Sequence, residues 1–213
     1  MSSATGNAAA AKSFWEEVDE IRHDDYRFYH QSRINQSLHL FSAICFLVTY
    51  ALIPFEPALA ALLGWVVAMC SRQAGHFFFE PNGYDVVHQM TFRQKEAVKV
   101  GFSQNRKIVL LLAWVTIPLV LWFSPTLFGH LPAFASTRGY LDRVGLGWFA
   151  LAGVGLLGRT CWLMATRSVQ TGAAWFVKIL LDPIHNIREY HASPLALLRG
   201  ERLDPAFRTN DQV

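Results

Sequence analysis

Residues 38–54 (LHLFSAICFLVTYALIP) form a continuous apolar run without Lys, Arg, Asp or Glu. A second, largely apolar run over residues 57–75 follows the short tip Pro54–Pro57, so the two runs predict a helical hairpin, with a re-entrant or interfacial pair as the alternative. Residues 108–128 and 145–165 each supply about 20 further apolar positions, enough to cross a bilayer core. We therefore expect an all-α integral membrane protein with about four transmembrane helices.

The composition of the whole chain agrees with this class. Of 213 residues, 52% are hydrophobic and 16% are charged, whereas soluble domains carry about 25% charged residues. These values do not suit a disordered chain, a nucleic-acid binder or an ordinary cytosolic enzyme. The three cysteines, Cys45, Cys70 and Cys161, lie in or beside apolar runs, so they predict neither a disulfide framework nor a cysteine metal site.

The basic residues predict the orientation in the membrane. Of the 19 Lys and Arg residues, only Arg138 and Arg143 fall between the third and fourth runs. Arg72 and Arg159 lie near the ends of the second and fourth runs, and the others precede the first run, separate the second from the third, or follow the fourth. By the positive-inside rule, both termini and the middle loop are cytoplasmic. We expect residues 1–20 to be disordered and residues 21–213 to form one membrane domain. Its cytoplasmic tail, residues 166–213, is expected to include an interfacial helix.

A glycine pattern inside the fourth run resembles a nucleotide-binding motif. Gly153, Gly155 and Gly158 have the spacing G-x-G-x-x-G. A dinucleotide-binding loop requires a preceding strand and a following helix in a soluble unit, which a membrane span does not provide. We therefore expect these small residues to let two membrane helices approach closely.

The histidines predict where chemistry takes place. Of the 8 histidines, only His130 falls on the predicted outer side. His39 and His76 stand at the cytoplasmic ends of the two hairpin runs, so the hairpin brings them together. Asn35 precedes His39 by four positions and Glu80 follows His76 by four, so each pair shares a helix face, where the second residue can orient a metal-bound imidazole or add a ligand. This clustering favours a metal site; the alternative is that the histidines are polar groups gathered at the membrane interface.

Three more histidines are candidate ligands. His30 precedes His39 by nine positions, which on an unbroken helix puts the two on roughly opposite faces. If both bind one metal, the chain must break between them, near Ser32–Arg33. In the tail, His185 and His191 lie on the same predicted side, so they are candidates to complete the site.

Two short segments resemble the motifs of a known family. Residues 28–39 (FYHQSRINQSLH) resemble the YH-x4-N-x3-H motif of the membrane-bound 2-hydroxy fatty acid dioxygenases of fatty-acid α-oxidation and their bacterial relatives. Residues 75–80 (GHFFFE) resemble the second signature of that family, GH-x2-FE. The resemblance extends over roughly residues 26–80. It departs at residues 81–88 (PNGYDVVH), where the family has a basic, Pro-containing stretch, and the later spans and the tail have no clear counterpart.

The resemblance implies an enzyme that uses Fe(II) and molecular oxygen to shorten a 2-hydroxy fatty acid by one carbon. It implies that His30, His39 and His76 are iron ligands and that Asn35 and Glu80 support them. The site would lie at the cytoplasmic face of a bacterial inner membrane or of the endoplasmic reticulum. Arg33 or Arg72 would attract the lipid carboxylate, or would simply anchor the cytoplasmic ends of the spans.

Two other functions stay open. A membrane di-iron hydroxylase or desaturase also places many cytoplasmic histidines beside four spans, although its H-x3-H and H-x2-HH spacings do not occur in this sequence. The third possibility is a non-catalytic lipid-binding or scaffold protein whose histidines are interfacial polar groups.

Overall fold

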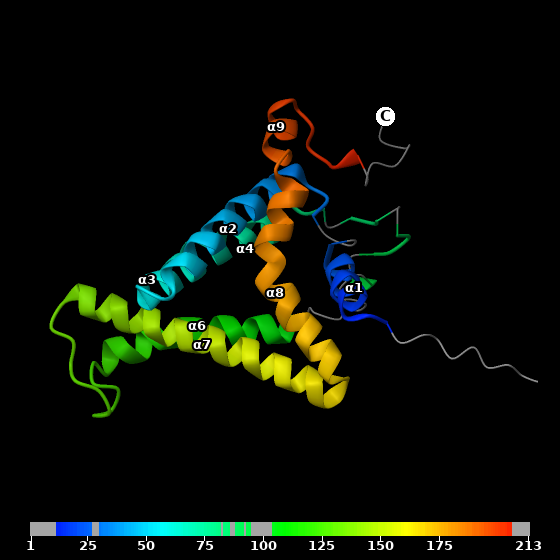
Figure 1. Cartoon of the computed structure of the whole chain (residues 1–213). Coiled ribbons are helices and arrows are strands. Elements are labelled where there is room, and N and C mark those ends of the chain that lie inside the picture. Colours follow the sequence, from blue (N-terminus) through cyan, green and yellow to red (C-terminus); the bar gives the residue numbers. More distant parts are fainter. Residues whose placement is uncertain are drawn as a thin grey trace, which may run out of the picture.

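The structure is a computed structural model that describes residues 12–26, 30–81, 83–85, 88–91, 93–94 and 104–205 (Figure 1). These residues are mostly helical and form no strand longer than an isolated bridge, so the predicted all-α class is confirmed for them. The elements are α1 (Phe14–Tyr26), α2 (Arg33–Leu52), α3 (Pro57–Leu62), η1 (Leu63–Met69), α4 (Cys70–Ala74), η2 (Gly75–Phe79), α6 (Gln104–Phe123), α7 (Thr137–Thr166), α8 (Val169–Tyr190) and α9 (Ser193–Leu198). The elements η1 and η2 are π-helical.

The predicted hairpin consists of α2 and the continuous helical body α3–η1–α4–η2. Ser32 is the N-cap of α2, and its Oγ accepts a hydrogen bond from the backbone N–H of Ile34 at 3.2 Å. Pro57 opens α3, where its missing N–H leaves no intrahelical bond unmade. Gly64 faces Thr49 across the hairpin, and a Cβ atom at Gly64 would already be in contact with that side chain at 3.4 Å. The two arms therefore pack closely.

A second pair, α6 and α7, packs through tryptophans. Pro118 lies inside α6 and cannot donate a backbone hydrogen bond to the carbonyl of Trp114, four residues earlier. The indole Nε1 of Trp148 on α7 donates to that carbonyl at 2.9 Å and replaces the lost bond. The hydroxyl of Tyr140 donates to the carbonyl of Pro118 itself at 3.0 Å. These bonds fix α7 against the proline-containing part of α6.

Among the described residues, three helices are long and apolar enough to cross a membrane: α2, the body Pro57–Phe79, and α7. Only 33%, 33% and 22% of their apolar windows are buried, so most of this apolar surface faces outward, as in lipid-facing helices. These helices suggest an integral membrane protein.

The third predicted span corresponds to α6, which ends earlier than expected. This helix covers Gln104–Phe123, 20 residues with an apolar stretch over Leu111–Phe123. The helix ends at Phe123 instead of continuing to residue 128. In the turns that follow, Leu127 and Phe128 adopt φ values of 47° and 56°, which a right-handed helix does not accommodate.

The segment predicted as a cytoplasmic tail contributes two packed helices, α8 and α9. Figure 1 shows α8 running from the end of α7 to the beginning of α2, with α1 beside it. Glu17 of α1 accepts hydrogen bonds from Gln170 Nε2 at 2.9 Å and from Thr171 Oγ1 at 2.5 Å. Helix α1 begins at Phe14, inside the segment 1–20 expected to be disordered; residues 1–11 lie outside the described part of the chain.

The expectation that the glycines of the fourth run mediate close helix packing is wrong for the described residues. A Cβ atom at Gly153, Gly155 or Gly158 would meet no atom within 4 Å. Close approach occurs instead at Gly145, where a Cβ atom would collide with the backbone of Ala58. The motif spacing does not reveal which face of α7 meets a neighbour, and this is why the expectation failed.

Candidate metal centre

Three histidines converge where α2 begins and η2 ends. The Nε2 atom of His39 lies 3.2 Å from Nε2 of His30 and 3.1 Å from Nε2 of His76. One ligand nitrogen of each residue lies within 4.8 Å of those of the other two. His30 and His39 are buried, and His76 is half-buried. This histidine triad can hold a metal ion.

The donor set of the triad suits a metal ion, because imidazole nitrogens are common metal ligands. A ring nitrogen carries either a proton or a lone pair, and the lone pair is what a metal ion requires. With metal–nitrogen bonds of about 2.0–2.1 Å, ligands in adjacent coordination positions have nitrogens roughly 2.9–3.4 Å apart. The distances from His39 to His30 and from His39 to His76 fall in this range, as expected for neutral imidazoles in adjacent coordination positions.

His30 reaches the triad because the chain turns sharply before α2. Its φ of 71° lies in the left-handed region, which costs a non-glycine residue about 1–2 kcal/mol. The predicted break near Ser32–Arg33 is confirmed, since α2 begins at Arg33. Glu80 stabilises this turn: its carboxylate accepts hydrogen bonds from the backbone N–H groups of Gln31 at 3.2 Å and Ser32 at 3.4 Å. Successive N–H groups around an αL residue form such an anion-binding concavity.

Asn35 connects Glu80 to α2. Its side chain is completely buried, and its Nδ2 donates to Oε1 of Glu80 at 2.6 Å. Burial raises the pKa of Glu80, whereas the hydrogen bonds from Asn35 and from the backbone of Gln31 act in the opposite direction. Gly75 leaves the space for this arrangement, because a Cβ atom there would lie 3.0 Å from Cγ of Asn35 and would collide with its Oδ1. Asn35 and Glu80 therefore hold the turn that carries His30, and the triad does not include them.

In the π-helical turn η2, two neighbouring residues contact different side chains of α2. Gly75 contacts Asn35, and His76, one position later, contacts His39. Such π-turns recur at functional sites. Glu80 leaves the helix with an extended backbone (φ −80°, ψ 137°), so the expectation that it shares a helical face with His76 is wrong. The matching expectation for Asn35 and His39 is confirmed, since both lie on the buried face of α2.

We expect Glu80→Gln to weaken metal binding by about tenfold to a hundredfold, the range found when a group that orients a metal ligand is removed. The glutamine side chain has one acceptor oxygen, whereas the Glu80 carboxylate has two and accepts from Asn35 and from two backbone N–H groups. The NH₂ group of the glutamine would face backbone N–H groups, which are also donors. Chelator competition on the purified protein measures the affinity. Glu189→Gln, at an exposed position on α8, is the matched control and should leave it unchanged. Equal affinities of the two variants would contradict the positioning role of Glu80.

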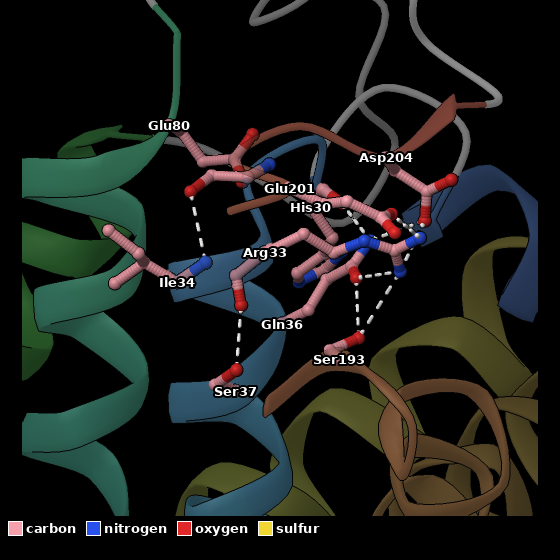
Figure 2. A network of polar contacts seen from close by, with 10 residues as sticks. His30, Arg33, Ile34, Gln36, Ser37, Glu80, Ser193, Glu201 and Asp204 are labelled. Atoms are coloured by element: carbon pink, nitrogen blue, oxygen red, sulfur yellow. Dashed lines mark hydrogen bonds and ion pairs between the residues drawn. The ribbon is translucent and has the colours of Figure 1, made fainter. Parts of the chain in front are cut away.

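The segment after α9 clamps the beginning of α2 (Figure 2). The backbone N–H of Arg33 donates to the carbonyl of Arg202, and that of Asp204 donates to the carbonyl of Gln31, both at 2.9 Å. The guanidinium of Arg33 lies 3.1 Å from the carboxylate of Asp204 and 3.9 Å from that of Glu201. Carboxylates of the chain itself thus engage Arg33, so the structure does not favour it as the anchor of a substrate carboxylate.

Gln36 joins this clamp to the triad. Its Nε2 donates to the carbonyl of His30 and to Oδ2 of Asp204, both at 2.8 Å. Its Oε1 accepts from Ser193 Oγ at 2.6 Å and from Arg33 at 2.8 Å, as Figure 2 shows. Ser193 and Asp204 are 157 and 168 residues away from Gln36 in the chain. No local sequence pattern could indicate such partners.

Helix α8 supplies another wall of the site through Tyr190. The centroid of its ring lies 5.6 Å from that of His30 and 6.2 Å from that of His39, and the residue is 5% exposed. Sequence reasoning missed Tyr190 as part of the site.

The same face of α8 carries Lys178, Asp182 and Asn186, all buried. Lys178 Nζ lies 3.1 Å from Asp182 Oδ2, and Arg72 of α4 lies 3.5 Å from the same atom. Arg72 is therefore also engaged within the chain. Lys178, Asp182, Asn186 and Tyr190 are spaced four residues apart. This spacing could have indicated from the sequence that one polar face of α8 points into the domain.

The triad does not include the two tail histidines proposed as further ligands. His191 is exposed at the C-cap of α8, and its Nδ1 donates to the carbonyl of Arg188 at 2.9 Å. His185 is partly buried near Arg22 of α1. Burial lowers the pKa of His185, and the positive charge of Arg22 lowers it further.

Comparison with known proteins gave no match to a family model, to a curated protein or to a solved structure. Of the first motif, Phe28 and Tyr29 lie outside the described residues. The chemistry of the site is therefore argued from its own side chains and from the two short motifs.

Proposed function

We propose that this chain is an Fe(II)-dependent membrane oxygenase that acts on a fatty-acyl lipid, most similar in chemistry to 2-hydroxy fatty acid dioxygenases. The observation that carries the proposal is the convergence of His30, His39 and His76 at one end of an apolar hairpin. Residues with the motif spacing of that family supply all three imidazoles.

The choice of iron among the possible metals rests on the motif resemblance and not on the ligand set. Imidazole ligands suit zinc, copper, iron and nickel alike, so the ligand set alone does not select the metal. The resemblance of the two motifs favours Fe(II). When bound by three protein ligands, Fe(II) keeps coordination positions open and supplies the binding and activation of molecular oxygen.

The chain's own residues position the ligands and separate the site from solvent. Glu80 and Asn35 hold the strained turn that presents His30. Tyr190 covers the rings of His30 and His39 from the side of α8. The charge distribution of the chain favours the cytoplasmic face for this end of the hairpin, where a lipid acid has its carboxylate at the interface and its alkyl chain among the spans.

Oxygen uptake tests the proposal. The protein is purified in nanodiscs, loaded anaerobically with Fe(II), and supplied with 2-hydroxyhexadecanoic acid or hexadecanoic acid. We expect oxygen consumption and a product one carbon shorter with the hydroxy acid, and neither with the Zn(II)-loaded protein. His130→Ala, on the exposed turn between α6 and α7, should behave as wild type. Iron-loaded protein that consumes no oxygen with any lipid acid would refute the oxygenase, and two irons per chain would favour the di-iron alternative.

A further inference from the structure

The C-terminal strap, residues 201–204, is the segment that clamps the beginning of α2. Ser32 and Leu203 form an isolated antiparallel bridge, and a backbone hydrogen bond on each side of it joins the strap to residues 31–33. These three residues directly follow His30 in the chain. The strap therefore holds the backbone that carries one ligand of the triad.

His30 is the member of the triad that does not lie in a helix. Its φ of 71° is a strained conformation, and such conformations persist only where the surrounding structure holds them. Gln36 connects it to the strap, because Nε2 of Gln36 donates both to the carbonyl of His30 and to Oδ2 of Asp204 at 2.8 Å. The position of His30 thus depends on the strap, whereas α2 and η2 themselves carry His39 and His76.

Polar contacts that are partly open to solvent hold the strap in place. The side chains of Glu201 and Asp204 are 37% and 23% exposed in their ion pairs with Arg33. Gly200, directly before the strap, has a φ of 87°, which glycine adopts at no steric cost. Segments with solvent-exposed hydrogen bonds open locally at a low free energy. The strap can therefore leave the site without unfolding a helix.

We propose that docking of the C-terminal strap and metal binding by the triad are thermodynamically coupled. The docked strap raises the metal affinity by holding His30, and the bound metal holds the strap in place through the same residue. The factor is equal in both directions, because a coupling free energy between two sites is reciprocal, and such factors are about 5- to 150-fold. The inference requires a metal in the triad, and it goes beyond the proposed function because it does not require the oxygenase reaction.

Charge reversal at Asp204 tests the effect of the strap on the metal. Asp204→Lys undocks the strap, because it places a cation beside the guanidinium of Arg33, which lies 3.1 Å from the native carboxylate. We expect the affinity for Zn(II), measured by chelator competition on the full-length protein in nanodiscs, to fall by about tenfold. Asp142→Lys is the matched control, because Asp142 lies 4.0 Å from Arg138 on α7. Equal affinities of the two variants would overturn the proposal.

A disulfide across the bridge separates docking of the strap from the contacts of the Asp204 side chain. Ser32 and Leu203 are paired between the two backbone hydrogen bonds, where the Cα atoms of an antiparallel pair are about 4.5 Å apart, a distance that a disulfide spans. Ser32→Cys and Leu203→Cys are combined with Asp204→Lys in a chain whose native cysteines are replaced by alanine.

We expect oxidation of this cysteine pair to restore the affinity for Zn(II) to within about threefold of the oxidised pair that keeps Asp204, and we expect reduction to reverse the gain. An oxidised protein that still binds Zn(II) as weakly as its reduced form would overturn the proposal. The loss would then come from the Asp204 side chain and not from undocking of the strap.

Hydrogen exchange tests the effect of the metal on the strap. The backbone N–H of Asp204 donates to the carbonyl of Gln31, so its exchange reports undocking. We expect Zn(II) to slow exchange of the Asp204 N–H in the wild-type protein by about tenfold. In His39→Ala, which lacks the central ligand, Zn(II) should leave the exchange unchanged. A wild-type strap whose exchange does not respond to Zn(II) would contradict the coupling.

The two proposals can fail separately. Coupling measured with Zn(II) in a protein that takes up no oxygen with Fe(II) would refute the oxygenase alone. Oxygen uptake by a protein whose strap docks independently of the metal would refute the coupling alone.

Discussion

Replacing His39 with alanine is expected to abolish stoichiometric metal binding, with a loss of affinity of about a hundredfold or more. His39 is the central member of the triad, since its Nε2 lies within 3.2 Å of the Nε2 atoms of both His30 and His76. Changes to groups that merely orient a ligand already cost 10- to 100-fold, so removal of the central ligand should cost more. The residue is also completely buried.

The experiment must separate loss of a ligand from loss of the fold. His39→Gln keeps most of the side-chain volume but removes the imidazole, so it should also lose the metal while retaining the helical circular dichroism of the wild type. His191→Ala removes an exposed histidine outside the triad and should bind like the wild type. Metal content by mass spectrometry and metal-dependent thermal stabilisation give two independent measurements. A folded His39→Ala protein that retains one metal per chain would contradict the assignment of the triad.

The hairpin could be predicted from the sequence because its signals are local. An uncharged run, a proline-rich tip and a second apolar run specify two antiparallel helices whatever the rest of the chain does. The break before α2 followed from a similar local argument: His30 and His39 could not share one metal on a continuous helix. In both cases the structure has the predicted feature, with α2 beginning at Arg33.

The features that escaped prediction depend on distant contacts or on small changes in helical geometry. Residues 201–204 clamp the turn at residues 31–33, and nothing in either segment specifies the other. The π-helical turns η1 and η2 change which residues face α2, and composition alone does not distinguish a π-turn from an α-turn. The early end of α6 at Phe123 is different, because it had a local signal that the sequence analysis missed: Pro125 disfavours the helical conformation at Ser124.

Gly75 received no role in the sequence analysis, and we expect Gly75→Ala to be among the most damaging single substitutions in the hairpin. A Cβ atom at this position would collide with Oδ1 of Asn35 and would lie 3.0 Å from its Cγ and 3.4 Å from its backbone Cα. Asn35 is completely buried and hydrogen-bonded to Glu80, so it has no space into which to move. Either η2 moves away from α2, which separates His76 from His39, or Asn35 releases Glu80 and the turn that carries His30.

Both responses predict a weaker metal site and a less stable protein. We expect metal affinity to fall by about tenfold to a hundredfold and the free energy of unfolding to fall by about 1–3 kcal/mol, the usual cost of overpacking. Chelator competition measures the first quantity and denaturant unfolding in micelles the second. Gly158→Ala on α7 is the matched control, because its Cβ atom would meet nothing within 4 Å and alanine favours a helix over glycine by about 1 kcal/mol. If Gly75→Ala bound metal as tightly as Gly158→Ala, the close contact of η2 with Asn35 would not be what aligns the triad.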